Sequence, residues 1–265
     1  MIRLLFEVAR GSFRRASSYR VATASGVFVN TVFGVLRASV LVYLAAENGG
    51  SVRGMTGSEL ATFAFVSQGF IMLVGMFGDP ELANRIRTGD VVIDLYRPVD
   101  LQWWWLSSWL GSAAFQLVGR GLPPVLLGAL LFDLTWPDPW WHWLVFAVSV
   151  VLASVIGFAV RFCASLVTFW LMDSRGIDQM VTLVMNFFAG LLLPLNLFPS
   201  WLETVARALP FASMIQLPAE IFLGQRDGIE LVGVIAQQLF WMVAMLGIGR
   251  WMLSRATYRV VIQGG

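Results

Sequence analysis

Five long stretches without a charged residue most constrain what this chain can fold into. Each contains between 19 and 24 residues: Leu60–Gly78, Leu101–Gly119, Pro139–Val160, Gln179–Leu202 and Leu231–Gly249. A helix needs about 20 apolar residues to cross the hydrocarbon core of a bilayer. The mean hydropathy of +0.74 and the hydrophobic content of 58% extend this character to the whole chain. The sequence therefore predicts an all-α, polytopic membrane protein with a single membrane domain over residues 1–265.

We expect six transmembrane helices in this domain. Their predicted ranges are Val21–Ala46, Leu60–Phe77, Ser112–Phe132, a span within Trp143–Met172, Met180–Leu195 and Leu231–Leu253. Tryptophan collects at the level of the lipid headgroups, so the tryptophans at 103, 104, 105 and 109 predict an interfacial segment leading into the third span. Pro123 and Pro124 predict a kink within that span.

Residues 1–20 have the pattern of an amphipathic helix. Arg3, Glu7, Arg10 and Arg14 recur at spacings of four, three and four, which places them on one face. Such a helix lies in the plane of the membrane interface, and a solvated helix is the alternative.

Residues 194–225 are too apolar for a free loop and too interrupted for a span. Pro194, Pro199, Pro210 and Pro218 divide them into short helices, which we expect to form a partly re-entrant outer segment packed against protein. Ser200 and Glu203 have the spacing of a capping box that would begin one of these helices.

The distribution of arginine predicts the orientation in the membrane. If the N-terminus lies in the cytoplasm, the inner segments carry twelve arginines and the outer segments carry only Arg53, Arg207 and Arg226. Short cytoplasmic loops are enriched in positive charge. We therefore expect both termini, and the charged residues 78–100, on the cytoplasmic side.

Residues 78–100 form the densest block of charge, with six charged side chains among residues 84–100. The pattern predicts a surface helix that breaks at Gly89 and ends before Pro98. We expect its apolar side to comprise Leu82, Ile86, Ile93 and either Leu95 or Tyr96. Such a helix would either anchor on lipid headgroups or bind a protein of mixed charge, and its acidic residues favour the second alternative.

Several classes of function lack the residues they need. The chain contains no lysine, so it has no G-x-x-x-x-G-K-[ST] loop for ATP hydrolysis. His142 is the only histidine, which leaves a metal site or a catalytic triad without partners. The predicted spans contain no carboxylate, which disfavours an ion-coupled carrier. They do contain Arg37, Arg120 and Arg161, each of which would either bind carbonyls and polar side chains within the bundle or contact a ligand.

Two parts of the sequence resemble a known family. Arg85-x-x-x-Gly89, followed nine residues later by Pro98, is similar to the "E-R-x-x-G-T…L…P" segment of type-2 ATP-binding-cassette (ABC) exporter permeases, although Asn84 and Asp90 depart from it. Further on, "LLLPLNLFPSWLETVARALPF…LPAEIFLGQ", then "Q..FW" and a terminal "GG", resemble a bacterial group of these permeases often encoded as paired genes beside an ATPase gene.

This resemblance implies a transport subunit without its own catalytic site or cofactor. ATP and magnesium would bind to a cytoplasmic ABC ATPase dimer, and a second permease chain, identical or paralogous, would complete a multi-pass exporter in the bacterial inner membrane. Membrane lipid would surround it, and no nucleic acid would bind. The substrate would be hydrophobic or amphipathic, such as a lipid-like compound, drug or antibiotic, as in multidrug efflux. An ion-coupled secondary carrier is the alternative.

The resemblance also implies roles for particular residues. Residues 78–100 would form the coupling helix that docks on the ATPase, through Glu81, Arg85, Arg87, Gly89, Asp94, Arg97 and Pro98. The substrate path would include Arg37, Gln68, Met72, Met76, Asn186 and Phe187, for which ordinary helix packing is the alternative. The outer gate would include Pro194, Pro199, Trp201 and Pro210.

Overall fold

The computed structural model describes residues 1–77, 81–171 and 175–263, and the side chains of the last helix as far as Thr257. The longer helices are α1 (Ile2–Ser18), α2 (Arg20–Glu47), α3 (Gly57–Phe70), α6 (Leu101–Gln116), α7 (Leu122–Leu131), α8 (Trp141–Leu166), α9 (Arg175–Phe188) and α12 (Ile229–Gln263). The shorter elements are β1 (Ser51–Val52), β2 (Met55–Thr56), α4 (Glu81–Thr88), α5 (Val91–Leu95), η1 (Leu117–Gly121), η2 (Val167–Phe169), η3 (Leu195–Leu197), α10 (Ser200–Ala208) and α11 (Gln216–Phe222).

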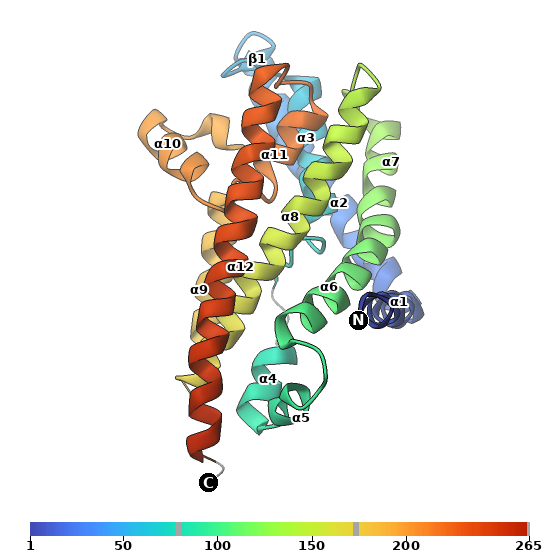
Figure 1. The fold of residues 1–265 in the computed structure, drawn as a ribbon. Helices are drawn as coiled ribbons and strands as arrows, with labels where there is room; N and C mark the ends of the chain where they lie inside the picture. The colour runs from blue at the N-terminus through green and yellow to red at the C-terminus, as the bar shows by residue number, and fades with distance from the viewer. Residues whose placement is uncertain (78–80, 172–174, 264–265) are drawn as a thin grey trace.

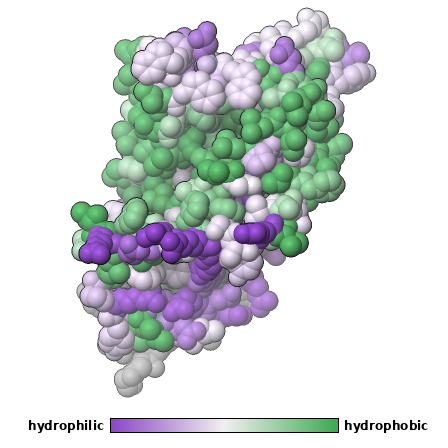
Figure 2. Space-filling model, turned by 90° about the vertical axis from the view of Figure 1, so that its right-hand side faces the viewer, coloured by the Kyte–Doolittle hydropathy of each residue, from purple (hydrophilic) through white to green (hydrophobic). Residues whose placement is uncertain are grey.

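Within the described residues, four helical segments are long and apolar enough to cross a membrane. They are Arg20–Glu47, Leu101–Leu131, Trp141–Phe169 and Ile229–Thr257. They run along the long axis of the molecule, and the β1–β2 hairpin lies at the end opposite α4 and α5 (Figure 1). Both termini lie toward the α4–α5 end. A broad hydrophobic surface occupies the middle, with a hydrophilic band near the level of α1 (Figure 2).

The helices α3 and α9 are shorter than the sequence predicted. The predicted second span reached Phe77, but α3 ends at Phe70, and residues 71–77 turn around Gly75, whose φ is +67°. The predicted fifth span reached Leu195, but α9 ends at Phe188, just before Gly190 with φ +83°. Each helix has 14 residues, which corresponds to about 21 Å, short of a hydrocarbon core of about 30 Å. That these two segments also cross the membrane, which would make six spans, stays a prediction.

The segment Leu101–Leu131 is continuously helical, and it bends between the oblique α6 and the upright α7, as predicted (Figure 1). The tryptophan-rich residues form α6 itself, and their place at the level of the lipid headgroups stays a prediction. The π-helical turn η1 joins α6 to α7, and the two prolines occupy the first turn of α7, where their missing N–H groups are tolerated. A Cβ on Gly121 would lie 2.8 Å from the Gly69 carbonyl oxygen, so glycine allows the backbones of α3 and η1 to touch.

Helix α1 packs along α6, which confirms a helix at the N-terminus. A Cβ on Gly111 of α6 would lie 1.9 Å from the carbonyl oxygen of Ala9. The hydroxyls of Ser12 and Ser108 are 2.8 Å apart, and Phe13 meets Phe115 edge to face. Small residues thus bring the two backbones together, and polar and aromatic contacts hold them in register.

The predicted capping box at Ser200 is wrong. Pro199 occupies the N-cap position of α10, Ser200 is the first helical residue, and no side chain caps this helix. Glu203 instead accepts a hydrogen bond of 2.8 Å from Nε of Arg207. A complete capping box begins α3, where Thr56 and Glu59 bond each other's backbone N–H groups.

Candidate functional site

Helices α4 and α5 form a compact element below α6 and beside the lower end of α12 in Figure 1. Asp94, only 1% exposed, joins the two helices. Arg85 Nε and Nη2 donate to its carboxylate at 2.5 and 2.9 Å, and Arg97 Nη2 lies 3.0 Å from it. The hydrogen bond to Asp94 raises the pKa of Arg85 above its ordinary value. Two-pronged arginine–carboxylate contacts are geometrically specific, so α4 and α5 are held in one arrangement. We call residues 81–98 the two-helix element.

The backbone of this element agrees with the sequence pattern. Helix α4 ends at Thr88, Gly89 has φ +84°, and α5 ends three residues before Pro98. Residues 78–80, the start of the predicted coupling helix, lie outside the described residues.

The predicted apolar side is correct except at Ile93. Leu82 and Ile86 of α4 are buried against α8 and η2. Of the alternatives Leu95 and Tyr96, Leu95 packs against the same apolar cluster and Tyr96 is 85% exposed. Ile93 is 63% exposed, and Val91 is the buried apolar residue of α5. The contact of Asp94 with its two arginines turns that face of α5 inward, which leaves Ile93 and Tyr96 outside.

Most of the predicted coupling residues make contacts within the chain. Glu81 forms a 3.6 Å ion pair with Arg15 of α1, and Arg97 also covers the ring of Trp104 at 4.1 Å. Arg85 is occupied by Asp94. Arg87, Gly89 and Pro98 are exposed. Arg85 and Glu81 thus make contacts that shape the element, and their contact with an ATPase stays a prediction.

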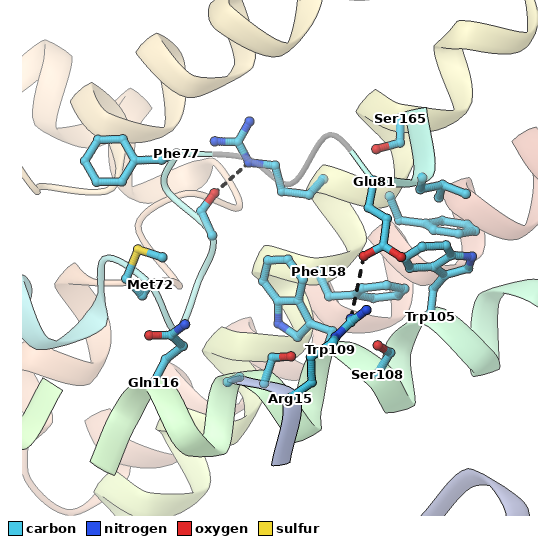
Figure 3. A pocket seen from close by; sticks show the side chains of 16 residues that line it. Arg15, Met72, Phe77, Glu81, Trp105, Ser108, Trp109, Gln116, Phe158 and Ser165 are labelled. Carbon is cyan, nitrogen blue, oxygen red and sulfur yellow. Dashed lines mark hydrogen bonds and ion pairs between the residues drawn. The ribbon is translucent and has the colours of Figure 1, made fainter. Parts of the chain in front are cut away.

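A cavity of about 270 Å³ lies between the two-helix element and helices α1, α6 and α8. Arg15 extends across it from α1 to Glu81, as Figure 3 shows. Trp109 and Phe158 form part of an aromatic wall, and Gln116 faces Met72. A second cavity of about 490 Å³ adjoins the first, and both are lined by Arg15 and Glu81. We call the smaller one the inner cavity.

Arg161 is the best-satisfied arginine of the predicted spans. It is 4% exposed, and it donates to the carbonyl oxygens of Gly75 at 2.7 Å and Met76 at 2.6 Å. It also donates to Asp178 and Thr182 of α9, both at 2.9 Å. One side chain of α8 therefore binds both the turn after α3 and the start of α9. This confirms that it pairs within the bundle.

The other two arginines are less satisfied. Arg37 donates to the hydroxyl of Ser67 at 3.0 Å, but its Nε and Nη2 atoms are buried without partners. Nε of Arg120 is buried without a partner among the described residues, and the guanidinium packs over Gly26, where a Cβ would lie 1.9 Å from Nη2.

The predicted path residues do not meet in one described cavity. Only Met72 lines the inner cavity. Gln68 and Met76 are buried, Asn186 has a buried Oδ1 without a partner, and Phe187 packs on Phe188 and Phe198. Their role in a substrate path stays a prediction.

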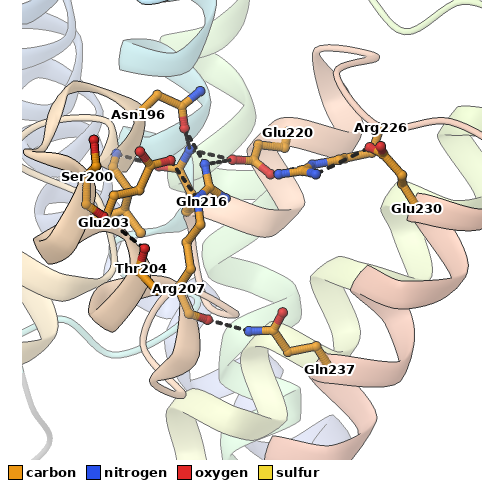
Figure 4. Close-up of polar contacts among 11 residues, drawn as sticks. Asn196, Ser200, Glu203, Thr204, Arg207, Gln216, Glu220, Arg226, Glu230 and Gln237 are labelled. Carbon is orange, nitrogen blue, oxygen red and sulfur yellow. Dashed lines mark hydrogen bonds and ion pairs between the residues drawn. The ribbon is translucent and has the colours of Figure 1, made fainter.

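A polar network crosses the predicted outer segment (Figure 4). Glu220 of α11, 1% exposed, lies 2.7 Å from Arg207 of α10 and 3.0 Å from Arg226. Gln216 bonds both Glu220 and Asn196. Of the predicted gate residues, Pro194 and Pro210 are buried and Pro199 and Trp201 are exposed. The sequence did not indicate this network, because its charges are spread over residues 203–230.

Among the described residues, no group of three or more potential ligands could hold a metal ion. His142 is buried, and its ring nitrogens lie 3.2 Å from the Asp138 carbonyl oxygen and 3.3 Å from that of Arg226. It thus connects the start of α8 to the segment before α12.

The fold and these sites together define a class of protein. It is an integral membrane protein with several apolar helices and a charged element at one end. The chain belongs to the ABC-2 family transporter proteins, whose family model matches residues 33–264. Comparison with curated proteins gave no match. This family is a membrane component of ABC transporters, so the chain is a transporter permease that associates with an ABC ATPase.

Proposed function

We propose that this chain is the permease subunit of an exporter in the bacterial inner membrane, with both termini in the cytoplasm. Hydrolysis of ATP with magnesium on a separate ATPase dimer would drive a hydrophobic or amphipathic substrate outward, and a second permease chain would complete the path. The two-helix element would dock on the ATPase, and residues 194–225 would gate the exit.

One observation carries this proposal. The two-helix element lies at the end of the molecule where the C-terminus lies, and its Ile93 and Tyr96 are exposed beside charged residues. Exposed aromatic and aliphatic side chains on a rigid support are typical anchors of a protein interface. The contact of Asp94 with Arg85 and Arg97 supplies the rigidity. An ATPase subunit fits this surface, because membership of the ABC-2 family implies association with an ABC ATPase.

An ion-coupled carrier fits the chain less well. Carriers of this kind use acidic residues within their spans. The four long helices carry carboxylates only at their ends, at Glu47 and Glu230.

Copurification of an ABC ATPase with this chain from its native membrane tests the proposal. Loss of an interface anchor costs about 2 kcal/mol or more, or about 30-fold in affinity. We therefore expect Tyr96→Ala to weaken ATPase binding by about 30-fold and to abolish ATP-driven transport in proteoliposomes. Tyr43→Ala is the matched control, because Tyr43 is an exposed tyrosine near the end of α2 that leads to β1, and β1 lies at the end opposite α4 and α5. If no ATPase binds, or if both variants bind it equally well, the proposal is wrong.

A further inference from the structure

The inner cavity has two chemically different sides. Ser108, Ser112 and Gln116 follow one another at intervals of four along α6, so they lie on one face of that helix. Trp109, Phe158 and Phe162 contribute an aromatic wall. Phe158 stacks on Phe162 at 5.3 Å between ring centroids and meets Trp109 edge to face at 6.0 Å. A molecule in this cavity would therefore meet aromatic rings and hydrogen-bonding groups at the same time.

Two polar atoms of the lining lack partners. Oε1 of Gln116 and Nε1 of Trp105 are buried, and neither makes a hydrogen bond to any residue that the structure describes. A buried polar group without a partner carries the full cost of its lost hydration. A ligand that offers a donor to Gln116 would remove part of that cost.

The size of the cavity limits the ligand. An apolar cavity of about 150 Å³ holds one benzene molecule. The inner cavity, at about 270 Å³, therefore has room for about two fused rings with small substituents. The half-exposed ion pair of Arg15 and Glu81 lies where the inner and the adjoining cavity meet, so polar substituents would face this opening.

We propose that the inner cavity binds a compact two-ring aromatic amphiphile. Its flat faces lie against Trp109, Phe158 and Phe162, and its polar edge follows Ser112 and Gln116. This goes beyond the proposed function, because the site lies within one chain and its occupation needs neither an ATPase nor a second permease. A lipid tail fits less well, since it offers nothing to the polar face of α6.

The position of the site connects its ligand to the two-helix element. Leu82 and Glu81 of α4 contribute to the lining, and Leu82 is also part of the apolar contact between α4 and α8. A bound ligand therefore touches the element directly, next to the ion pair that joins it to α1.

Binding of dansylamide to the purified permease in lipid nanodiscs tests the proposal. Dansylamide has two fused rings and a sulfonamide, and it accepts excitation energy from tryptophan. The chain has 12 tryptophans, so probe that merely partitions into lipid gives a signal that rises without saturation. We expect a saturable signal in addition. Naphthalenesulfonamide should displace the probe, whereas naphthalene, which lacks the polar edge, should compete at least fivefold less well.

Variants of α6 locate this signal. Ser112→Phe fills the cavity and should abolish the saturable signal, whereas Ser112→Ala leaves the space open and should retain it. Ser107→Phe is a matched control on the same helix, since Ser107 is not part of the lining and bonds the Trp103 carbonyl. Gln116→Leu removes the unpaired acceptor and should weaken binding about fivefold, the factor expected for one hydrogen bond. This milder variant serves as a second test if Ser112→Phe does not fold.

Three results would overturn the proposal. A signal without a saturable part would indicate partition into lipid only. Dodecylphosphocholine could displace the probe better than naphthalenesulfonamide, which would indicate a lipid-tail site. Equal binding by Gln116→Leu and the unaltered chain would show that the polar face of α6 does not contact the ligand.

Discussion

Replacing Glu220 by glutamine tests whether the network of the outer segment holds that segment together. The substitution keeps the size of the side chain but removes its charge and one acceptor oxygen. In the structure, each carboxylate oxygen of Glu220 contacts a different arginine, Arg207 at 2.7 Å and Arg226 at 3.0 Å. Gln216 adds a third hydrogen bond of 2.9 Å. The new amide N–H₂ group would face a guanidinium instead.

The expected loss of stability follows from the surroundings of these groups. Removing one partner of a buried ion pair costs about 3–5 kcal/mol. Arg207 still pairs with Glu203, and Arg226 still pairs with Glu230. Both arginines are partly exposed, so water relieves some of the cost. We therefore expect a loss of about 2–3 kcal/mol in the free energy of unfolding. For a chain of this size, that lowers Tm by about 4–12 °C.

A thiol-reactive fluorescent dye measures this change. Cys163 is the only cysteine, and it is half-buried between α8 and α12, with its Sγ 3.8 Å from the Met245 carbonyl oxygen. The dye should therefore react quickly once these helices separate. Glu230→Gln is the matched control, because Glu230 is 59% exposed and pairs only with Arg226 at 3.3 Å in the described network. Such exposed pairs contribute about 0–1 kcal/mol.

The comparison between the two variants decides the outcome. If Glu220→Gln and Glu230→Gln lower Tm equally, or if neither changes it, the buried carboxylate does not organise the outer segment. A gate in this region would then move without breaking the contacts of Glu220.

Two further predictions concern close contacts inside the molecule. Gly111→Leu should separate α1 from α6, because the new Cβ would overlap the Ala9 carbonyl. Faster proteolysis within α1 would show this separation, and unchanged proteolysis would contradict it. Gly11→Leu is the control, because a Cβ on Gly11 would meet nothing within 4 Å. Arg161→Lys should lower Tm in the same dye assay by more than Glu220→Gln, because lysine cannot reach Gly75, Met76 and Asp178 together; an unchanged Tm would show that the turn after α3 holds without Arg161.

The long helices could be predicted because their signal is local. A charge-free run of sufficient length indicates a span wherever it occurs, and α8 and α12 each contain such a run. Helix α2 also lies where a span was predicted, although Arg37 interrupts its apolar residues. The break at Gly89 and the end before Pro98 are likewise local effects of two residues.

The shortening of α3 has a different origin. Its sequence remains apolar as far as Phe77, but Arg161 donates to carbonyl oxygens at Gly75 and Met76 that a continuing helix would use itself. This contact joins residues about 85 positions apart, so no pattern within residues 60–77 reveals it. The inner cavity could not be predicted for the same reason, because its lining comes from five separate parts of the chain.

The orientation of α5 was also beyond the sequence pattern. Five residues make too little of a helix for an apolar face to be read from spacing, and Ile93 was assigned to the buried side. Asp94 decides the matter through two arginines, one on α4 and one after α5. A charged residue, rather than an apolar one, therefore selects the buried face.

The connection between α1 and α2 has a mechanical consequence. Only Tyr19 separates the two helices, with φ −85° and ψ 61°. One residue offers two soft torsions and almost no slack. The position of α1 is therefore tightly coupled to that of α2. When α1 tilts or slides, α2 must rotate or shift with it. Arg15 binds Glu81 one helical turn before Tyr19. A displacement of α4 is therefore transmitted through α1 to α2.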